Sequence, residues 1–145
     1  MLPFGALAKR AFDRYYKNRD PEVRLAGLED ALSTVIRRSG ADSGPAARGR
    51  VAVADQLEGM GRYTEARLLR EAAFTAHRRN LGDDDEQTVI AEASLALNLA
   101  ESDLPEEAKA HFMHVHEVRL RTLGPQNDRT KWCERWIAYL DREAD

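Results

Sequence analysis

Three histidines lie close together in the C-terminal third of the sequence, and imidazole is a frequent metal ligand and acid–base group. His111 and His114 are three positions apart, so they share a face if the segment is helical, whereas His116 points elsewhere. A metal site also needs a third ligand and supporting hydrogen bonds, and the spacing provides neither. We therefore expect no metal site, and we expect these histidines to lie on a solvated helix face.

The other reactive residues also lack the patterns that chemistry requires. The acidic run 83–86 lacks the glycine and the final glutamate of a calcium loop, so it indicates a solvated loop that precedes a helix. Cys133 is the single cysteine, so no internal disulfide forms. The sequence contains no glycine-rich phosphate loop, no arrangement typical of a nucleophilic triad and no zinc spacing. It therefore predicts a protein that is not an enzyme and needs no cofactor.

Composition restricts the class of partner. The 145 residues include 22 Lys and Arg against 25 Asp and Glu, which lacks the basic excess of a dedicated nucleic-acid-binding protein. No apolar run approaches the roughly 20 residues that span a bilayer, and the segment 1–10 is too interrupted for a signal peptide. We therefore expect a cytoplasmic protein that binds neither nucleic acid nor membrane.

Aromatic residues gather near the end of the chain. Trp132 and Trp136 are one helical turn apart and so share a helix face, and Tyr139 and Leu140 follow them. Two interpretations stay open. The rings pack on the preceding helical hairpin, or they form an apolar patch for a partner or for a second copy of the chain.

A repeat of 42 residues organises the sequence, and three pairs of matching segments carry it. These pairs are 63–67 with 105–109, 81–82 with 123–124, and Thr88 with Thr130. The same spacing extends more weakly into the first 44 residues. We therefore predict one domain, 1–145. It has a degenerate repeat at about 5–44, repeats at about 45–86 and 87–128, and a capping helix at about 129–143.

Each repeat has the pattern of two helices joined by a turn. Apolar residues recur at steps of three and four along 48–60 and again along 64–80. Gly61 separates these runs, and Gly82 follows the second, where a residue with positive φ often ends a helix. Neither helix buries its apolar stripe alone, so stacked pairs must share a core. The pattern predicts an all-α fold of about seven antiparallel helices, which form three hairpins and a C-terminal capping helix.

A consensus of small and large residues recurs in both clear repeats. Its members are Val53, Ala54, Leu57, Gly61, Tyr63, Glu65, Ala66, Leu69, Ala73, Leu81, Gly82, Thr88, Leu95, Ala96, Glu106, Glu107, Ala108, Phe112, Leu123, Gly124, Pro125 and Thr130. In this pattern the chain resembles the long tetratricopeptide repeats of kinesin light chains and many bacterial proteins, over about 45–140 and in outline over 5–44. The resemblance implies an α-α superhelix, or solenoid, that binds proteins.

The resemblance also implies a concave groove lined by the first helix of each pair. Its exposed positions would include Lys9, Asp13 and Tyr16 in the degenerate repeat, and Glu58 in the next. The candidates for partner binding are Arg48, Asp55, Ile90, Leu97, Glu101, Trp132, Arg135, Trp136 and Tyr139. Ile90 and Leu97 are equally well explained as core residues.

These features predict a non-catalytic adaptor or scaffold that binds a peptide or partner protein through the groove or through the C-terminal aromatic face. The alternative is a regulatory sensor subunit of a bacterial signalling or transcription-control system. Two departures leave room for it. First, basic residues lie along one predicted hairpin, from Arg62 to Arg79. Second, the family has asparagines that hold a bound peptide, and in this sequence those positions are Ala52, Ser94 and Trp136. Self-association through the final helix is a third hypothesis.

Overall fold

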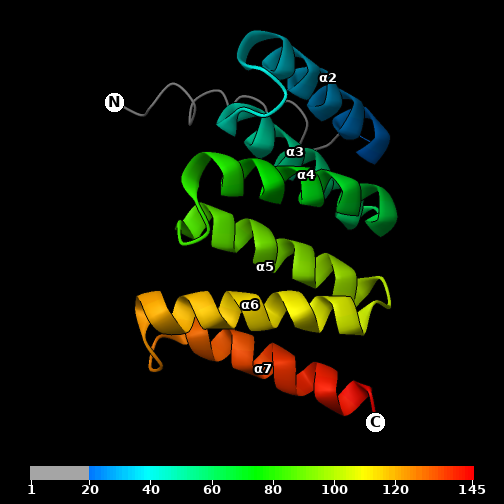
Figure 1. Ribbon diagram of the computed structural model, residues 1–145. Helices are drawn as coiled ribbons and strands as arrows, with labels where there is room; N and C mark the ends of the chain where they lie inside the picture. The colour runs from blue at the N-terminus through cyan, green and yellow to red at the C-terminus, as the bar shows by residue number, and fades with distance from the viewer. Residues whose placement is uncertain (1–19) are drawn as a thin grey trace.

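The computed structural model describes residues 20–145, and this part of the chain is all-helical, as predicted (Figure 1). The predicted first helix and the expected groove positions Lys9, Asp13 and Tyr16 lie outside the described residues. The helices are α2 (Pro21–Ser39), α3 (Gly44–Gly59), α4 (Tyr63–Leu81), α5 (Glu86–Glu101), α6 (Pro105–Leu123) and α7 (Asp128–Glu143). None of the described helices is both long enough and apolar enough to cross a membrane.

The helices are stacked in sequence order. Each helix packs mainly against the helix before it and the helix after it, and neighbours run in opposite directions (Figure 1). Consequently α3, α5 and α7 run parallel to one another, with their N-terminal turns at the same edge of the stack. This arrangement places three helices of the same direction along one side.

Helix lengths and positions repeat with the spacing of the sequence matches. The helices α3, α5 and α7 each contain 16 residues and begin at residues 44, 86 and 128, which are 42 positions apart. The helices α2, α4 and α6 each contain 19 residues and begin at 21, 63 and 105, again 42 apart. Thus α2 keeps this register although the sequence of its repeat is degenerate.

The loops between successive pairs also repeat. The side chains of Ser43, Asp85 and Asn127 cap α3, α5 and α7, and each accepts a hydrogen bond from a backbone N–H in the first turn. The glycine that ends each preceding helix has a positive φ, 89° at Gly82 and 85° at Gly124. Equivalent residues therefore start and stop the helices in each repeat, which keeps the helix directions constant.

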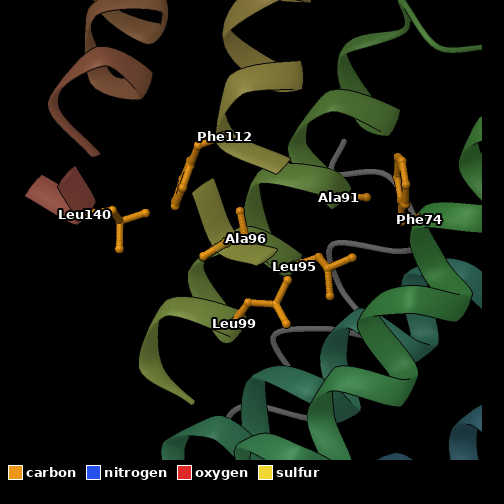
Figure 2. Packing of buried hydrophobic residues seen from close by; sticks show 8 residues of the cluster. Phe74, Ala91, Leu95, Ala96, Leu99, Phe112 and Leu140 are labelled. Carbon is orange, nitrogen blue, oxygen red and sulfur yellow. The ribbon is translucent and has the colours of Figure 1, made fainter. Parts of the chain in front are cut away.

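Small side chains allow the helices to approach, and large ones fill the layer between them. Ala66 on α4 and Ala108 on α6 are fully buried at equivalent positions. The main apolar cluster surrounds Phe112, with Leu95 and Leu99 of α5 and Leu140 of α7 (Figure 2). Because this cluster has members on four helices, from Phe74 of α4 to Leu140 of α7, it anchors α7 to the rest of the stack.

Candidate functional site

Three contiguous hollows lie along the side formed by α3, α5 and α7. The α3–α5 hollow, of about 210 Å³, is lined by Arg48, Val51, Arg70, Ala73, His77, Gln87, Ile90, Ala91 and Ser94. The α5–α7 hollow, of about 410 Å³, is lined by Ile90, Ala93, Ser94, Leu97, Arg119, Asp128, Arg129, Trp132 and Arg135. The tryptophan pocket, of about 490 Å³, is lined by Ala100, Glu101, Asp103, Trp132, Arg135, Trp136 and Tyr139. Adjacent hollows share residues, so together they form one groove.

The first two hollows are built by equivalent residues of successive repeats. Five residues of the α3–α5 hollow have counterparts 42 positions later in the α5–α7 hollow. The pairs are Arg48 with Ile90, Val51 with Ala93, His77 with Arg119, Gln87 with Arg129, and Ile90 with Trp132. The spaces between helices therefore recur with the helices, and the groove follows from the repeat.

The structure places eight of the nine candidate residues along this groove, and Asp55 is the exception. Ile90 is 48% exposed at the junction of the first two hollows, so it does not complete the core. Leu97 is half-buried and packs against the Phe112 cluster while it lines the α5–α7 hollow. The Asp55 carboxylate instead accepts a hydrogen bond from Arg70, 2.5 Å away.

Arg70 of α4 is the centre of a polar cluster that joins α3, α4 and α5 at the wall of the groove. It donates to both carboxylate oxygens of Glu58 on α3, at 3.1 Å from Nε and 2.7 Å from Nη2. Glu58 also accepts a hydrogen bond from Asn98 on α5, at 2.9 Å. Burial alone would lower the pKa of Arg70, but the hydrogen bonds of Glu58 and Asp55 outweigh it, so the pKa is raised. Arg70 is therefore a permanent cation that holds the groove wall in place.

The aromatic residues of α7 take part in both packing and the pocket. The Trp136 ring is stacked on Phe112 of α6, with centroids 5.4 Å apart and planes 4° apart. Trp132 meets the same ring edge-on at 5.6 Å, and Tyr139 meets Trp136 edge-on at 5.6 Å. Trp132 and Trp136 thus pack on the preceding hairpin through the ring surfaces that contact Phe112, as the first of the two interpretations expects. The remaining ring surfaces line the tryptophan pocket.

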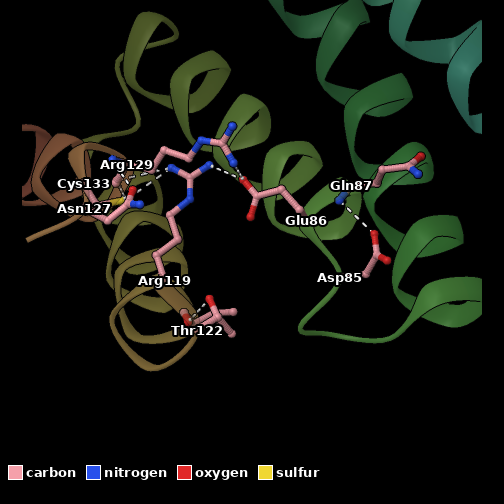
Figure 3. Close-up of polar contacts among 9 residues, drawn as sticks. Asp85, Glu86, Gln87, Arg119, Thr122, Asn127, Arg129 and Cys133 are labelled. Carbon is pink, nitrogen blue, oxygen red and sulfur yellow. Dashed lines mark hydrogen bonds and ion pairs between the residues drawn. The ribbon is translucent and has the colours of Figure 1, made fainter. Parts of the chain in front are cut away.

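A second polar cluster supports the N-terminal end of α7 (Figure 3). Arg119 of α6 donates to Glu86 of α5 at 3.3 Å, and Arg129 of α7 donates to the same oxygen at 3.0 Å. The Arg119 guanidinium also lies 5.7 Å from the centre of the Trp132 ring. The neighbouring Cys133 thiol is fully buried, and burial raises its pKa despite the opposing effect of Arg119. This thiol is therefore poorly suited to act as a nucleophile.

The three histidines are partly exposed, as expected, but each also contacts an acid on a neighbouring helix. His111 and His114 do share a face, but both contact the buried carboxylate of Glu92 on α5, through Nδ1 atoms at 2.9 and 2.6 Å. His116 instead contacts Glu134 of α7 at 3.1 Å. Over residues 20–145, no group of three or more Cys, His, Asp or Glu side chains is placed to hold a metal ion. These contacts join neighbouring helices and lie outside the groove.

Comparison with protein families and with curated proteins identified no relative of this chain. No protein-family model matches the chain, and a search of curated proteins found none that does. The tetratricopeptide interpretation therefore depends on the residue pattern and on the helix spacing.

Proposed function

We propose that this chain is a non-catalytic tetratricopeptide-like module that binds a peptide or a partner protein in the groove along α3, α5 and α7. The observation that carries the proposal is that the α3–α5 hollow recurs 42 residues later as the α5–α7 hollow, on the same side of the stack. Recurring sites on parallel helices suit a ligand that is itself extended, such as a polypeptide segment. In this proposal the stack is an α-α superhelix, and the module acts in the cytoplasm.

The side chains of the groove are those that contribute most to protein recognition. Trp132, Trp136, Tyr139 and Arg135 gather in the largest hollow, and Trp, Tyr and Arg are the residue types most enriched at binding hot spots. The stacking of Trp136 on Phe112 restricts the indole before any partner arrives. A restricted ring loses less conformational entropy on binding, which favours affinity.

The experiment compares partner capture by the wild-type chain with capture by groove variants. Ile90→Glu places a charge at the junction of the α3–α5 and α5–α7 hollows. Trp132→Ala removes a ring that lines both the α5–α7 hollow and the tryptophan pocket. The matched control is Leu68→Glu, because Leu68 is 67% exposed on α4 and lines none of the three hollows.

We expect affinity purification followed by mass spectrometry to recover a partner with the wild type and with Leu68→Glu, but not with the two groove variants. Circular dichroism of each variant verifies that the helices are retained. If both folded groove variants retain the partner, the groove is not the binding site. A partner lost equally with Leu68→Glu would also contradict the assignment.

A further inference from the structure

We propose that the tryptophan pocket receives a cationic side chain, arginine or lysine, from the bound polypeptide. This inference rests on the proposed function and specifies the chemistry of the partner at one end of the groove. It follows from the charges that line the three hollows, from the backbone at Asp103, and from the aromatic rings.

The balance of charge reverses along the groove. The α3–α5 hollow is lined by three basic side chains, Arg48, Arg70 and His77, and by no acid. The α5–α7 hollow is lined by three arginines and one acid, Asp128. Only the tryptophan pocket has more acids than bases among its lining residues, with Glu101 and Asp103 against Arg135. A cation is therefore complementary to this pocket and to neither of the others.

The two carboxylates of the pocket are available to a ligand. Within residues 20–145, neither Glu101 nor Asp103 lies within 4.0 Å of a basic side chain. By contrast, Glu92 of α5 contacts two histidines, and Asp141 of α7 contacts Lys109. Two acids without a basic partner therefore line the largest of the three hollows.

Asp103 occupies a turn position at which the preceding repeat has a glycine. Asp103 has a φ of 58°, and the equivalent residue of the preceding repeat, 42 positions earlier, is Gly61 with a φ of 77°. Glycine adopts positive φ without a steric penalty, whereas a residue with a side chain does so at a cost. The turn alone would favour glycine, and the chain instead places an acidic residue among those that line the pocket. Residues held in such conformations concentrate at functional sites.

The aromatic rings complete a site for a cation. The faces of Trp and Tyr rings carry negative potential and attract guanidinium or ammonium groups. Trp132, Trp136 and Tyr139 line the pocket, and its volume of about 490 Å³ is within the usual range for ligand sites. An apolar side chain in the same place would displace water from Glu101 and Asp103 without replacing its hydrogen bonds. A cationic side chain satisfies both the rings and the carboxylates.

Tryptophan fluorescence tests this inference directly, because the chain contains two tryptophans and both line the pocket. The probes are N-acetyl-arginine amide, its neutral isostere N-acetyl-citrulline amide, and N-acetyl-leucine amide. We expect a saturable fluorescence change with the arginine probe. We expect binding about tenfold weaker with citrulline, a ratio that corresponds to about 1.4 kcal/mol. No saturation with arginine, equal binding of citrulline, or tighter binding of leucine would overturn the proposal.

The double variant Glu101→Gln, Asp103→Asn removes both charges and keeps the shapes, and asparagine tolerates positive φ. The matched control is Glu117→Gln, because Glu117 is an exposed acid on α6 that lines none of the three hollows. We expect the double variant to lose the preference for arginine over citrulline and the control to retain it. Retention of that preference in the double variant would also overturn the proposal.

Partner capture separates this inference from the proposed function. Suppose that Ile90→Glu and Trp132→Ala lose the partner, while the double variant captures it as well as the wild type. The groove then binds a partner whose contacts with the pocket are not cationic, so the proposed function stands and the inference fails. Loss of the partner in the double variant, with retention in Glu117→Gln, supports both.

Discussion

The buried carboxylate of Glu92 on α5 lies 2.6 Å from the Nδ1 atom of His114 on α6. Its other oxygen lies 2.9 Å from Nδ1 of His111, one turn earlier on the same helix. Glu92 is 5% exposed, so the two imidazoles are its main replacement for water. One buried side chain therefore ties two turns of α6 to α5.

Removal of the imidazoles is expected to cost more than removal of the acid. In His111→Ala, His114→Ala the Glu92 carboxylate stays buried without partners, which lowers the free energy of unfolding by about 3 kcal/mol. In Glu92→Leu the partly exposed histidines turn to water, and the loss is about 1 kcal/mol. Urea unfolding of the two variants measures the difference. A greater loss in Glu92→Leu would show that the histidines are not needed to satisfy the acid.

A pH effect is expected from His77, which is 4% exposed. Burial and, to a smaller extent, the Arg48 charge lower its pKa below the ordinary value of about 6.5. As the pH falls below that value, the unfolded chain takes up a proton at this position before the folded chain does. The contribution of His77 to stability is thus complete above about pH 6.5 and is lost as the pH falls toward the lowered folded pKa.

The variant His77→Leu isolates this contribution from those of the other histidines. Its free energy of unfolding should fall less than that of the wild type between about pH 7 and pH 5. Urea unfolding at several pH values provides the measurement. Identical pH dependence in the two proteins would show that His77 titrates alike in the folded and unfolded states.

Two neighbouring glycines are expected to respond to alanine with opposite signs. Gly59 ends α3, and Gly61 has a φ of 77° in the following turn. A Cβ atom at either position would meet nothing within 4 Å, so packing does not distinguish them. Gly59→Ala should stabilise the protein by about 0.5 kcal/mol, and Gly61→Ala should destabilise it by about 1 kcal/mol. Thermal unfolding compares them, and destabilisation of the same size in both would contradict the backbone argument.

The converse change at Asp103 is expected to separate stability from binding. Asp103→Gly relieves the positive φ of 58° and should raise the free energy of unfolding by about 0.5 to 1 kcal/mol. It also removes a carboxylate from the tryptophan pocket, so binding of the arginine probe should weaken. Thermal unfolding and the fluorescence titration measure the two effects. A decrease in stability would show that the carboxylate supports the turn itself.

The thiol of Cys133 is expected to react slowly in the folded protein. It is fully buried, and its pKa is raised chiefly by burial, so the reactive thiolate is scarce at neutral pH. Reaction with a chromogenic disulfide should be slow in buffer and rapid in concentrated urea. Rapid reaction in buffer would indicate frequent opening of the layer between α6 and α7.

The repeat made the helices predictable, whereas the polar contacts between them were not. The break between two apolar runs placed the turn at Gly61, and the position of Gly82 after the second run predicted its positive φ, because both depend on local chain geometry. The contact of Glu92 with His114 joins residues 22 positions apart on different helices. The spacing of histidines within one helix does not reveal such a contact, because the acid belongs to another helix. Whether the groove residues bind a partner stays a prediction.

Asp55 and Asp103 show the same limit at the candidate site. Family resemblance placed Asp55 in the groove from its helix position, but its carboxylate accepts a hydrogen bond from Arg70, 15 positions later. Asp103 was not among the candidate residues, because nothing in the local sequence shows that its turn lies beside the aromatic residues of α7. Side-chain direction depends on neighbouring helices, which single-helix patterns do not describe.

Within residues 20–145, helix contacts lie mainly between sequence neighbours, so the stack is expected to bend as a flexible rod does. Small changes of angle at each junction would add along this part of the chain, because α2 and α7 are not among the helix pairs that pack together. A polypeptide bound across α3, α5 and α7 would contact three helices at once and so resist that bending. Binding would therefore be measurable as an increase in stiffness, even where no helix changes its internal structure.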